Sequence, residues 1–202
     1  MATNTKKSAK STLDRRVAVR TILAERGDSL LVTGLGSSCY DAGTMDHPLS
    51  YYLWGGMGGA TMIGVGMALA QPKRRTLVIT GDGEMLMGLG SLATIGAEKI
   101  SNLSVIVIDN ELYSETGMQP THTSRGVDLA GVAQAAGFVT TANISTLAEL
   151  KTWIPKIYNA PGPLFLNIKV NANRYPLSIR LRDGAHIKNR FREALLGSKA
   201  FD

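Results

Sequence analysis

The sequence predicts an α/β fold: an open, doubly wound parallel sheet flanked by helices on both faces, in a single domain. Strand-like runs and helix-like segments alternate along the chain, which is the pattern of layered α/β folds. The strand-like runs are continuously apolar, as expected for parallel strands buried on both faces. The chain has 202 residues, 44% of them hydrophobic, which is enough for one such domain with a full core.

The individual elements follow from the apolar pattern. Residues 13–26 place apolar side chains at helical spacing among charges, whereas residues 58–70 are small and apolar nearly all round, which suits a helix packed closely against a sheet. Further helices are expected over 88–99, 127–136, 146–158 and 185–196. Strands are expected over 29–33, 76–80, 103–108 and 164–170. Loops or irregular segments are expected over 34–50, 111–125 and 171–184.

Both ends of the chain are basic. Residues 1–12 are expected to be a disordered basic tail, and residues 13–198 the folded domain, including a C-terminal irregular segment and helix. The tail precedes no apolar stretch, so it does not resemble a secretory signal. A run of about 18 apolar residues is also missing, so we expect no membrane span.

Charge and cysteine content narrow the function classes. The net charge is +6, but aromatic residues make up only 6% and no nucleic-acid-binding motif is present, so we favour solvated faces over a nucleic-acid partner. The single cysteine, Cys39, excludes a disulfide framework and an iron–sulfur cluster held by this chain alone. A cytoplasmic location is expected.

Two consecutive apolar runs end in residues that bind metals. The first ends at Gly81-Asp82-Gly83 and the second at Asp109-Asn110. The 26 residues from 84 to 109 that separate Gly83 from Asn110 are the length of one crossover, so both strand ends would lie side by side. One carboxylate and one amide carbonyl are hard oxygen ligands of the kind that magnesium prefers.

The residues around Asp82 suit a phosphate. Glycine lets the backbone N–H groups of Gly83 and Glu84 approach an anion closely, and the N-terminus of the following helix adds favourable potential. Asp-Gly alone is usually a turn, and Asp-Asn at a strand end is often only the start of a loop. The two together, at crossover spacing on buried strands, favour a metal–phosphate site.

This pattern resembles the fingerprint of enzymes that depend on thiamine diphosphate (ThDP). The resemblance implies a magnesium ion held by Asp82, Asn110 and the backbone carbonyl of Leu112. Upstream, Gly55-Gly56-Met57-Gly58 resembles the segment that grips the aminopyrimidine ring of ThDP. There the Gly55 carbonyl would accept from the 4′-amino group, and Met57 would prop the cofactor in its bent form, which makes C2 deprotonation intramolecular.

The loop after the first strand would meet the same edge of the sheet. Its residues Gly36, Ser37 and Ser38 are candidates for binding the diphosphate or the pyrimidine. The spacing from Gly34 to Cys39 also approximates a dinucleotide fingerprint, but the third glycine is missing, which makes that reading the weaker one.

A longer resemblance is to the diphosphate-binding (PP) part of sulfopyruvate and phosphonopyruvate decarboxylases. It is carried by residues 66–72, 90–96 and 115–121. It implies a beta subunit of a two-subunit 2-oxo acid decarboxylase that needs ThDP and Mg²⁺ and releases carbon dioxide and an aldehyde. The activating glutamate would lie in a separate pyrimidine-binding alpha subunit, in a hetero-oligomer such as alpha2beta2 or larger.

The substrate would be a small anionic 2-oxo acid. Tyr113 and Glu115, just past the metal loop, are the candidates on the substrate side, and Tyr113 is also a candidate cofactor contact. The loop 37–41 departs from the Ser-Arg-Glu run of those decarboxylases, so the particular acid stays open. Two alternatives also remain: the PP subunit of a ThDP-dependent carboligase, and a non-catalytic ThDP-binding module.

Overall fold

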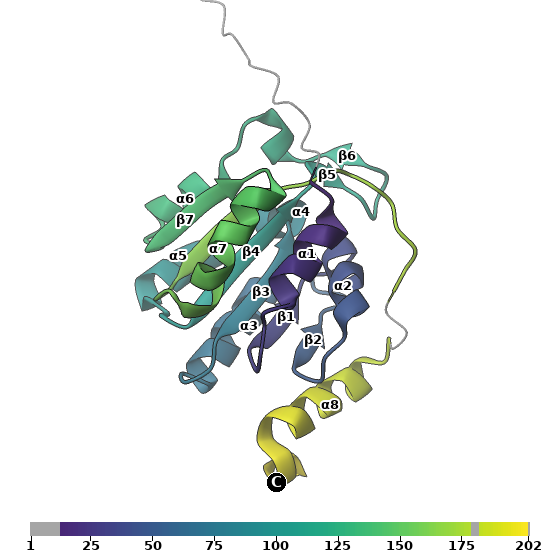
Figure 1. Ribbon diagram of the computed structural model, residues 1–202, viewed down its shortest axis with the longest axis vertical. Helices are drawn as coiled ribbons and strands as arrows, with labels where there is room; N and C mark the ends of the chain where they lie inside the picture. Colours follow the sequence, from purple (N-terminus) through teal and green to yellow (C-terminus); the bar gives the residue numbers. More distant parts are fainter. Residues whose placement is uncertain (1–12, 179–181, 202) are drawn as a thin grey trace, which may run out of the picture.

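The computed structural model describes residues 13–178 and 182–201 of the chain. Within them, a parallel sheet with the strand order β2-β1-β3-β4-β8-β7 forms the centre (Figure 1). Its strands are β1 (Leu30–Thr33), β2 (Ser50–Tyr52), β3 (Thr76–Gly81), β4 (Leu103–Asp109), β7 (Thr140–Ile144) and β8 (Leu164–Lys169). The chain leaves β1 towards β2 on one side and returns to β3 on the other. The switch point, where open α/β sheets bind ligands, therefore lies between β1 and β3.

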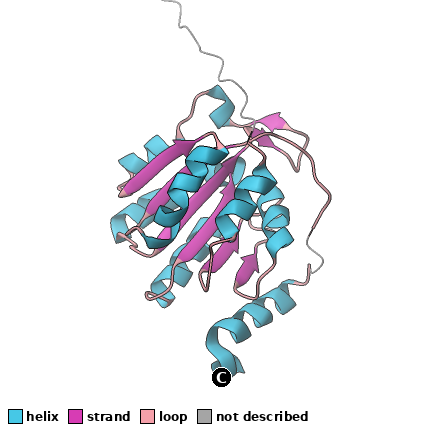
Figure 2. Ribbon diagram, in the orientation of Figure 1, coloured by secondary structure: helices cyan, strands magenta, loops and turns pink. Residues whose placement is uncertain are grey.

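Helices cover both faces of the sheet (Figure 2). On one face lie α1 (Arg15–Leu23), α2 (Ser37–Ala42) and α7 (Leu147–Asn159). On the other lie α3 (Ala60–Ala70), α5 (Gly90–Glu98) and α6 (Leu129–Ala135). Strand β3 alternates between the two cores: Leu77 and Ile79 join the first, and Val78 joins the second. The predicted fold class is confirmed.

Helix α3 packs against the sheet as closely as its small residues predict. A Cβ atom on Gly64 would come within 2.2 Å of Val78 Cγ2, so only glycine allows this approach. The burial is nevertheless one-sided, because Met62 is 43% exposed and Leu69 is 58% exposed. The helix packs closely on the side that faces the sheet, as expected, whereas its outer face is exposed in this chain.

Five of the elements in this part of the fold were missed in the sequence. The expected loop over 34–50 contains α2, a 3-10 turn (Gly43–Met45) and the edge strand β2, which are too short to show a period. Helix α4 (Asp82–Met87) begins directly at the end of β3. Strand β7 is an edge strand with a half-exposed, polar sequence, so it lacks the apolar run of the central strands.

The expected loop over 111–125 carries three short elements: β5 (Leu112–Tyr113), β6 (Gln119–Pro120) and a 3-10 helix η2 (His122–Arg125). In Figure 1, β5 and β6 lie beside α4, at the end of the sheet opposite α8 (Gly184–Leu196). Helix α8 packs Phe191 against Leu30 and Leu49, and a 3-10 helix (Gly197–Phe201) follows it. The predicted tail, 1–12, lies outside the described residues.

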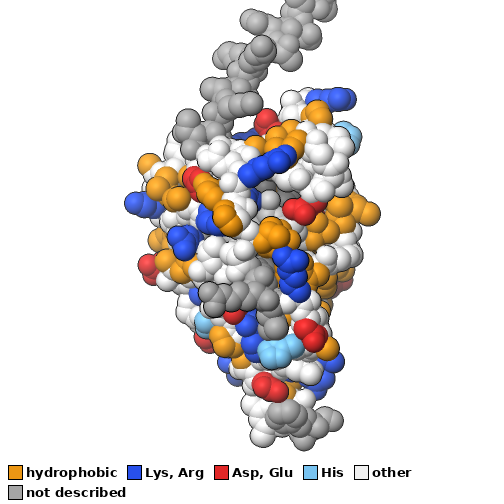
Figure 3. All heavy atoms as spheres, turned by 90° about the vertical axis from the view of Figure 1, so that its right-hand side faces the viewer, with side chains coloured by type: hydrophobic (Ala, Val, Ile, Leu, Met, Phe, Trp, Pro, Cys, Tyr) orange, Lys and Arg blue, Asp and Glu red, His pale blue; other side chains and the backbone are white. Residues whose placement is uncertain are grey.

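The surface shows no concentration of basic charge on the face seen in Figure 3, where Lys and Arg side chains are dispersed among hydrophobic and acidic ones. Cys39 is fully buried in the core that contains α1 and α2. Across residues 13–178 and 182–201, no helix is both long enough and apolar enough to cross a membrane.

Candidate functional site

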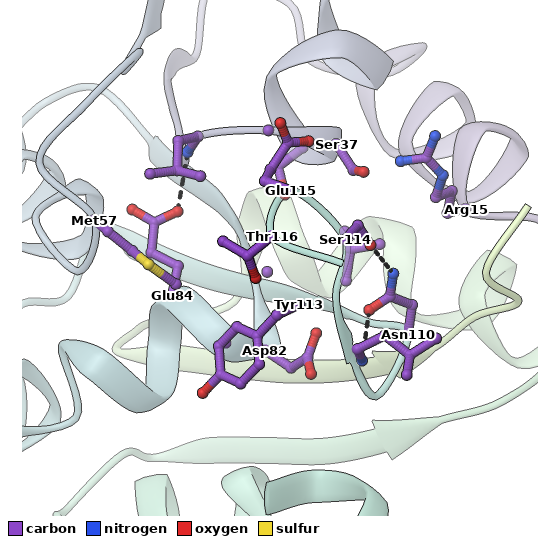
Figure 4. A pocket seen from close by; sticks show the side chains of 17 residues that line it. Arg15, Ser37, Met57, Asp82, Glu84, Asn110, Tyr113, Ser114, Glu115 and Thr116 are labelled. Carbon is purple, nitrogen blue, oxygen red and sulfur yellow. Dashed lines mark hydrogen bonds between the residues drawn. The ribbon is translucent and has the colours of Figure 1, made fainter. Parts of the chain in front are cut away.

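A cavity of about 310 Å³ opens at the carboxyl ends of β1, β3 and β4. It lies at the switch point between β1 and β3, and it gathers most of the residues singled out in the sequence (Figure 4). The predicted site residues that line it are Gly36, Ser37, Ser38, Met57, Asp82, Gly83, Glu84, Asn110, Leu112, Tyr113 and Glu115. Gly55 is the exception: it is exposed on the loop before α3 and is not part of this lining.

Asp82 lies at the centre of the cavity, at the start of α4, and is only 2% exposed. Its Oδ2 accepts hydrogen bonds from the Thr121 hydroxyl at 2.5 Å and from the Thr123 hydroxyl at 3.4 Å. Burial, together with the nearby charge of Asp109, raises the pKa of this carboxyl to about 7. The bonds that it accepts from other described side chains all go to Oδ2, so Oδ1 remains for a cation.

A buried network holds Asp109 behind Asp82. The fully buried Asp109 carboxylate pairs with Lys169 Nζ at 2.8 Å and accepts from Thr123 at 2.8 Å and Asn167 at 3.1 Å. Thr123 contacts both carboxylates, so it links the network to Asp82. Lys169 also pairs with Glu111 at 2.8 Å. The network holds the end of β4 in place and positions η2 against Asp82, the candidate metal ligand.

Asn110 follows Asp109 and is held by its own loop. Its Oδ1 accepts from the Leu112 N–H at 3.0 Å, and its Nδ2 donates to the Ser114 hydroxyl at 2.8 Å. In the two-stranded sheet Leu112 stands opposite Pro120, which has no N–H to donate to the Leu112 carbonyl. The predicted metal ligands are thus brought to one cavity, although Asp82 begins α4, Asn110 follows β4 and Leu112 begins β5.

Two glycines in the site are required by close contacts. A Cβ on Gly83 would lie 2.4 Å from the Tyr113 ring, so glycine lets that ring close over the start of α4. A Cβ on Gly34 would lie 1.9 Å from Glu84 Oε2, which accepts from the Leu35 N–H at 3.0 Å. Glu84 is 5% exposed, and burial raises its pKa. Its carboxylate joins the loop after β1 to the start of α4.

The remaining predicted residues occupy the walls of the cavity. Met57 lies beside Glu84 at one end in Figure 4, with Ser37 towards the other. Ser38 is buried, whereas Glu115 is exposed, and its carboxylate would be 3.0 Å from a Cβ on Gly36. Among the side-chain hydrogen bonds that Asp82 accepts from described residues, none comes from Tyr113 or Glu115. The two candidates therefore border the cavity without being tied to its metal-binding centre.

The sequence analysis missed several residues of the site. Arg15, Ser114 and Thr116 line the cavity, and Thr121 and Thr123 hold Asp82 from behind. Arg15 stands 67 positions before Asp82 on a helix that looks like an ordinary amphipathic one, so spacing gives no signal for it. Thr121 and Thr123 lie in a segment without periodicity, where only their closeness to the strand end could have indicated a role.

Comparison with known proteins agrees with the geometry. Residues 33–168 match the family described as thiamine pyrophosphate enzyme, C-terminal TPP binding domain; thiamine pyrophosphate is another name for ThDP. The sulfopyruvate decarboxylase subunit beta of Methanothermobacter thermautotrophicus is 32% identical over 187 residues, covering 92% of this chain and 97% of that protein. The phosphonopyruvate decarboxylase of Streptomyces viridochromogenes is 36% identical over 158 residues, covering 77% of this chain and 39% of that protein.

A solved structure shows the same fold. The benzoylformate decarboxylase from Polynucleobacter necessarius superposes with a TM-score of 0.69 at 20% identity, covering 87% of this chain and 36% of that chain. The chain thus spans nearly the whole of a protein named as a beta subunit, but less than half the length of the two longer decarboxylases that it matches. It belongs to the thiamine diphosphate-dependent enzymes, and it contains their C-terminal, cofactor-binding domain.

The residues of the cavity fit this cofactor and its metal. Among the residues that the structure describes, no cluster of three or more His, Cys, Asp or Glu side chains is arranged to hold a metal ion. A magnesium ion here would therefore need the Asp82 carboxylate, neutral oxygens of Asn110 and Leu112, and oxygens from a ligand, as is usual for magnesium bound with a diphosphate. Asp82 Oδ1, to which no described side chain donates, and the carbonyl of Leu112 opposite Pro120 are the protein oxygens available for this set.

The pKa of Asp82 gives a pH-dependence with a definite sign. Metal binding requires the carboxylate, so with a pKa of about 7 the affinity for Mg²⁺ and ThDP is expected to fall about tenfold from pH 8 to pH 6. Titration calorimetry of the assembled enzyme at both pH values would measure this. An affinity that does not change over this range would contradict the assignment.

The same pKa predicts an effect on stability without ligands. Because the folded pKa of Asp82 lies above its unfolded value of 3.8, the cost of burying the carboxylate grows as the pH rises from about 4 to about 7 and is then constant. Asp82→Asn should therefore raise the unfolding temperature more at pH 8 than at pH 5. Thermal unfolding of the ligand-free protein would test this, and a gain that is equal at both pH values would contradict it.

Proposed function

We propose that residues 13–198 form the PP domain of the beta subunit of a two-subunit, ThDP- and Mg²⁺-dependent 2-oxo acid decarboxylase. The observation that carries the proposal is the meeting of Asp82 and Asn110, from the ends of two adjacent strands, in one cavity at the switch point of the sheet. The match over 97% of a protein named as a sulfopyruvate decarboxylase beta subunit supports the same reading.

In this proposal each side of the cavity has one task. Asp82, Asn110 and the Leu112 carbonyl hold magnesium, and the N–H groups of Gly83 and Glu84, with Gly36, Ser37 and Ser38, bind the diphosphate. Met57 supports the bend of the cofactor from the opposite end, where it lies beside Glu84. Gly55, exposed next to Met57, is available to the pyrimidine ring from outside this cavity.

The proposed chemistry divides between the cofactor and the chain. When bound, ThDP supplies an electron sink for the electron pair left as carbon dioxide departs from a 2-oxo acid. The chain's own residues bind and orient the cofactor. The Thr121 hydroxyl holds Asp82 by a hydrogen bond, the Ser114 hydroxyl holds Asn110 in the same way, and the Tyr113 ring covers the start of α4. Tyr113 and Glu115 are the proposed contacts for a small anionic substrate.

A partner subunit is part of the proposal. The two glutamates that line the cavity are already placed: the buried Glu84 carboxylate accepts from the Leu35 N–H, and Glu115 is exposed. Gly55 lies on the exposed part of the loop before α3, outside the cavity lining. We therefore propose that the activating glutamate comes from a separate pyrimidine-binding alpha subunit, in an alpha2beta2 or larger assembly. The exposed apolar side chains Met62 and Leu69 of α3 and Met87 of α4 support an assembly of this kind.

The experiment that tests this function is a substrate panel. The chain would be co-purified with the alpha subunit and supplied with ThDP and Mg²⁺, and carbon dioxide release would be measured from sulfopyruvate, phosphonopyruvate and pyruvate. We expect release from one of the anionic 2-oxo acids, with an aldehyde as the second product. A condensation product in place of the aldehyde would identify a carboligase, and turnover of none of the acids would contradict an enzymatic role.

A further inference from the structure

Arg15, in the first turn of α1, is a buried cation at one end of the cavity. It is 5% exposed, and it lines the cavity together with Ser37 and Asn110. Its Nε donates to the Asn173 carbonyl at 3.1 Å. Its Nη1 has no hydrogen-bond partner among the described residues, although it lies 3.3 Å from Asp41 Oδ2. A guanidinium nitrogen that is buried without a hydrogen bond is costly, so it indicates a missing acceptor.

Among the described residues, the carboxylate paired with Arg15 is Asp41, and it is shared with Arg16. Asp41 is fully buried, and its Oδ1 accepts from Arg16 Nε at 2.9 Å, with good geometry, whereas its contact with Arg15 is the longer one. Arg16 is therefore the better neutralised of the two cations. Asp14, which is also near, is occupied by the N–H groups of the first turn of α1 and by the Tyr175 hydroxyl. The charge of Arg15 is therefore only partly neutralised, and it gives the cavity a positive electrostatic potential.

The place of Arg15 along the cavity indicates the ligand. Figure 4 shows Met57 and Glu84 at one end and Arg15 with Ser37 at the other, with Asp82 between them. A neighbouring hollow of about 330 Å³ shares Arg15, Ser37 and Asn110, but not Met57 or Asp82, so Arg15 lies at the end away from Met57. In the proposed function the cofactor is bent over Met57 and its diphosphate is held at Asp82. The chain of phosphates therefore continues from Asp82 towards Arg15.

We infer that Arg15 binds the terminal phosphate of ThDP, an inference that rests on the proposed function. A magnesium ion already paired with the Asp82 carboxylate leaves negative charge on a diphosphate, and a guanidinium offers two parallel donors to phosphate oxygens. The Ser37 hydroxyl, on the same side of the cavity, supplies a further donor. Helix α1 thus contributes a cofactor-binding residue from outside the strand-end loops that carry the recognisable motifs.

The test compares ThDP with thiamine monophosphate, which lacks the terminal phosphate. The complex of the chain with its alpha subunit would be titrated with each ligand in excess Mg²⁺ by calorimetry. Arg15→Met should weaken ThDP binding by about ten- to a hundredfold, the usual range for one charged hydrogen-bonding group, and leave thiamine monophosphate nearly unchanged. Arg15→Lys, which keeps the charge but loses the paired donors, should fall between Arg15→Met and the wild type.

The matched control is Arg20→Met. Arg20 lies on the same helix, is exposed, donates to Thr44 at 3.1 Å and does not line the cavity, so its loss should leave both affinities unchanged. The unfolding temperature of each ligand-free complex would separate a folding defect from a binding defect. Equal weakening of both ligands by Arg15→Lys, or unchanged binding of ThDP by Arg15→Met, would overturn the assignment. A wild-type complex that binds neither ligand would overturn the proposed function and, with it, this assignment.

Discussion

Replacing Asp82 by alanine is expected to lower the affinity of the assembled enzyme for Mg²⁺ and ThDP more than about a hundredfold. Loss of a residue that only supports a metal ligand typically costs 10- to 100-fold, and Asp82 is the proposed ligand itself. The substitution also removes the one carboxylate among the proposed ligands, and the neutral oxygens of Asn110 and Leu112 do not replace its charge. Calorimetric titration of ThDP at fixed Mg²⁺ would measure the loss.

The control for this variant is Asp28→Ala. Asp28 is an aspartate at the surface, with a side chain 81% exposed and paired only with Arg74 at 3.4 Å among the described residues. Surface pairs of this kind contribute little, so both affinity and stability should stay close to the wild type. If Asp82→Ala retained magnesium-dependent ThDP binding within a few fold, the proposed metal site would be wrong.

Replacing Asp109 by alanine is expected to have the largest effect on stability, a loss of about 3–5 kcal/mol in the free energy of unfolding. Within the described part of the chain, the fully buried carboxylate has four partners: Lys169, Thr123, Asn167 and the Glu111 N–H. Its removal takes an acceptor away from each of these donors, and Lys169, which is 26% exposed, loses a fully buried counter-ion while it keeps its pair with Glu111. Urea denaturation monitored by circular dichroism would give the free energy.

Glu111→Gln is the matched variant for the same network. Glu111 is 35% exposed in its side chain, so loss of its pair with Lys169 should cost less than about 1 kcal/mol. Asp109→Asn keeps the shape and should fall between the two. Equal losses for Asp109→Ala and Glu111→Gln would show that the buried network does not support the end of β4.

The sequence was sufficient for the fold class because the central strands carry their own signal. Strands β3 and β4 are buried on both faces, so each is a continuous apolar run, and each is followed directly by a polar residue of the site, Asp82 and Asn110. Strands β2 and β7 lie at the edges, where half-exposed, polar sequences such as that of β7 show no such run. Helices α2 and α4 have six residues each, too few for a period of 3.6 to be visible.

The same difference separates the site residues that the sequence could predict from those that it could not. Asp82 and Asn110 could be predicted because strand ends in a parallel sheet meet at one edge, which makes their distance in space a consequence of the topology. Arg15 and Thr123 could not, because they reach the cavity from a helix on one face and from a long loop, and no spacing rule relates them to the strands. Tertiary packing alone brings them to the site.

The most direct test of the account is a reconstitution of carbon dioxide release. This chain, its alpha subunit, and the mixture of the two would each be given ThDP, Mg²⁺ and an anionic 2-oxo acid such as sulfopyruvate. The account predicts release by the mixture and none by either subunit alone, because Asp82 and Asn110 hold one half of the cofactor while the activating glutamate lies on the other chain. Turnover by this chain alone, or no turnover by the mixture, would contradict it.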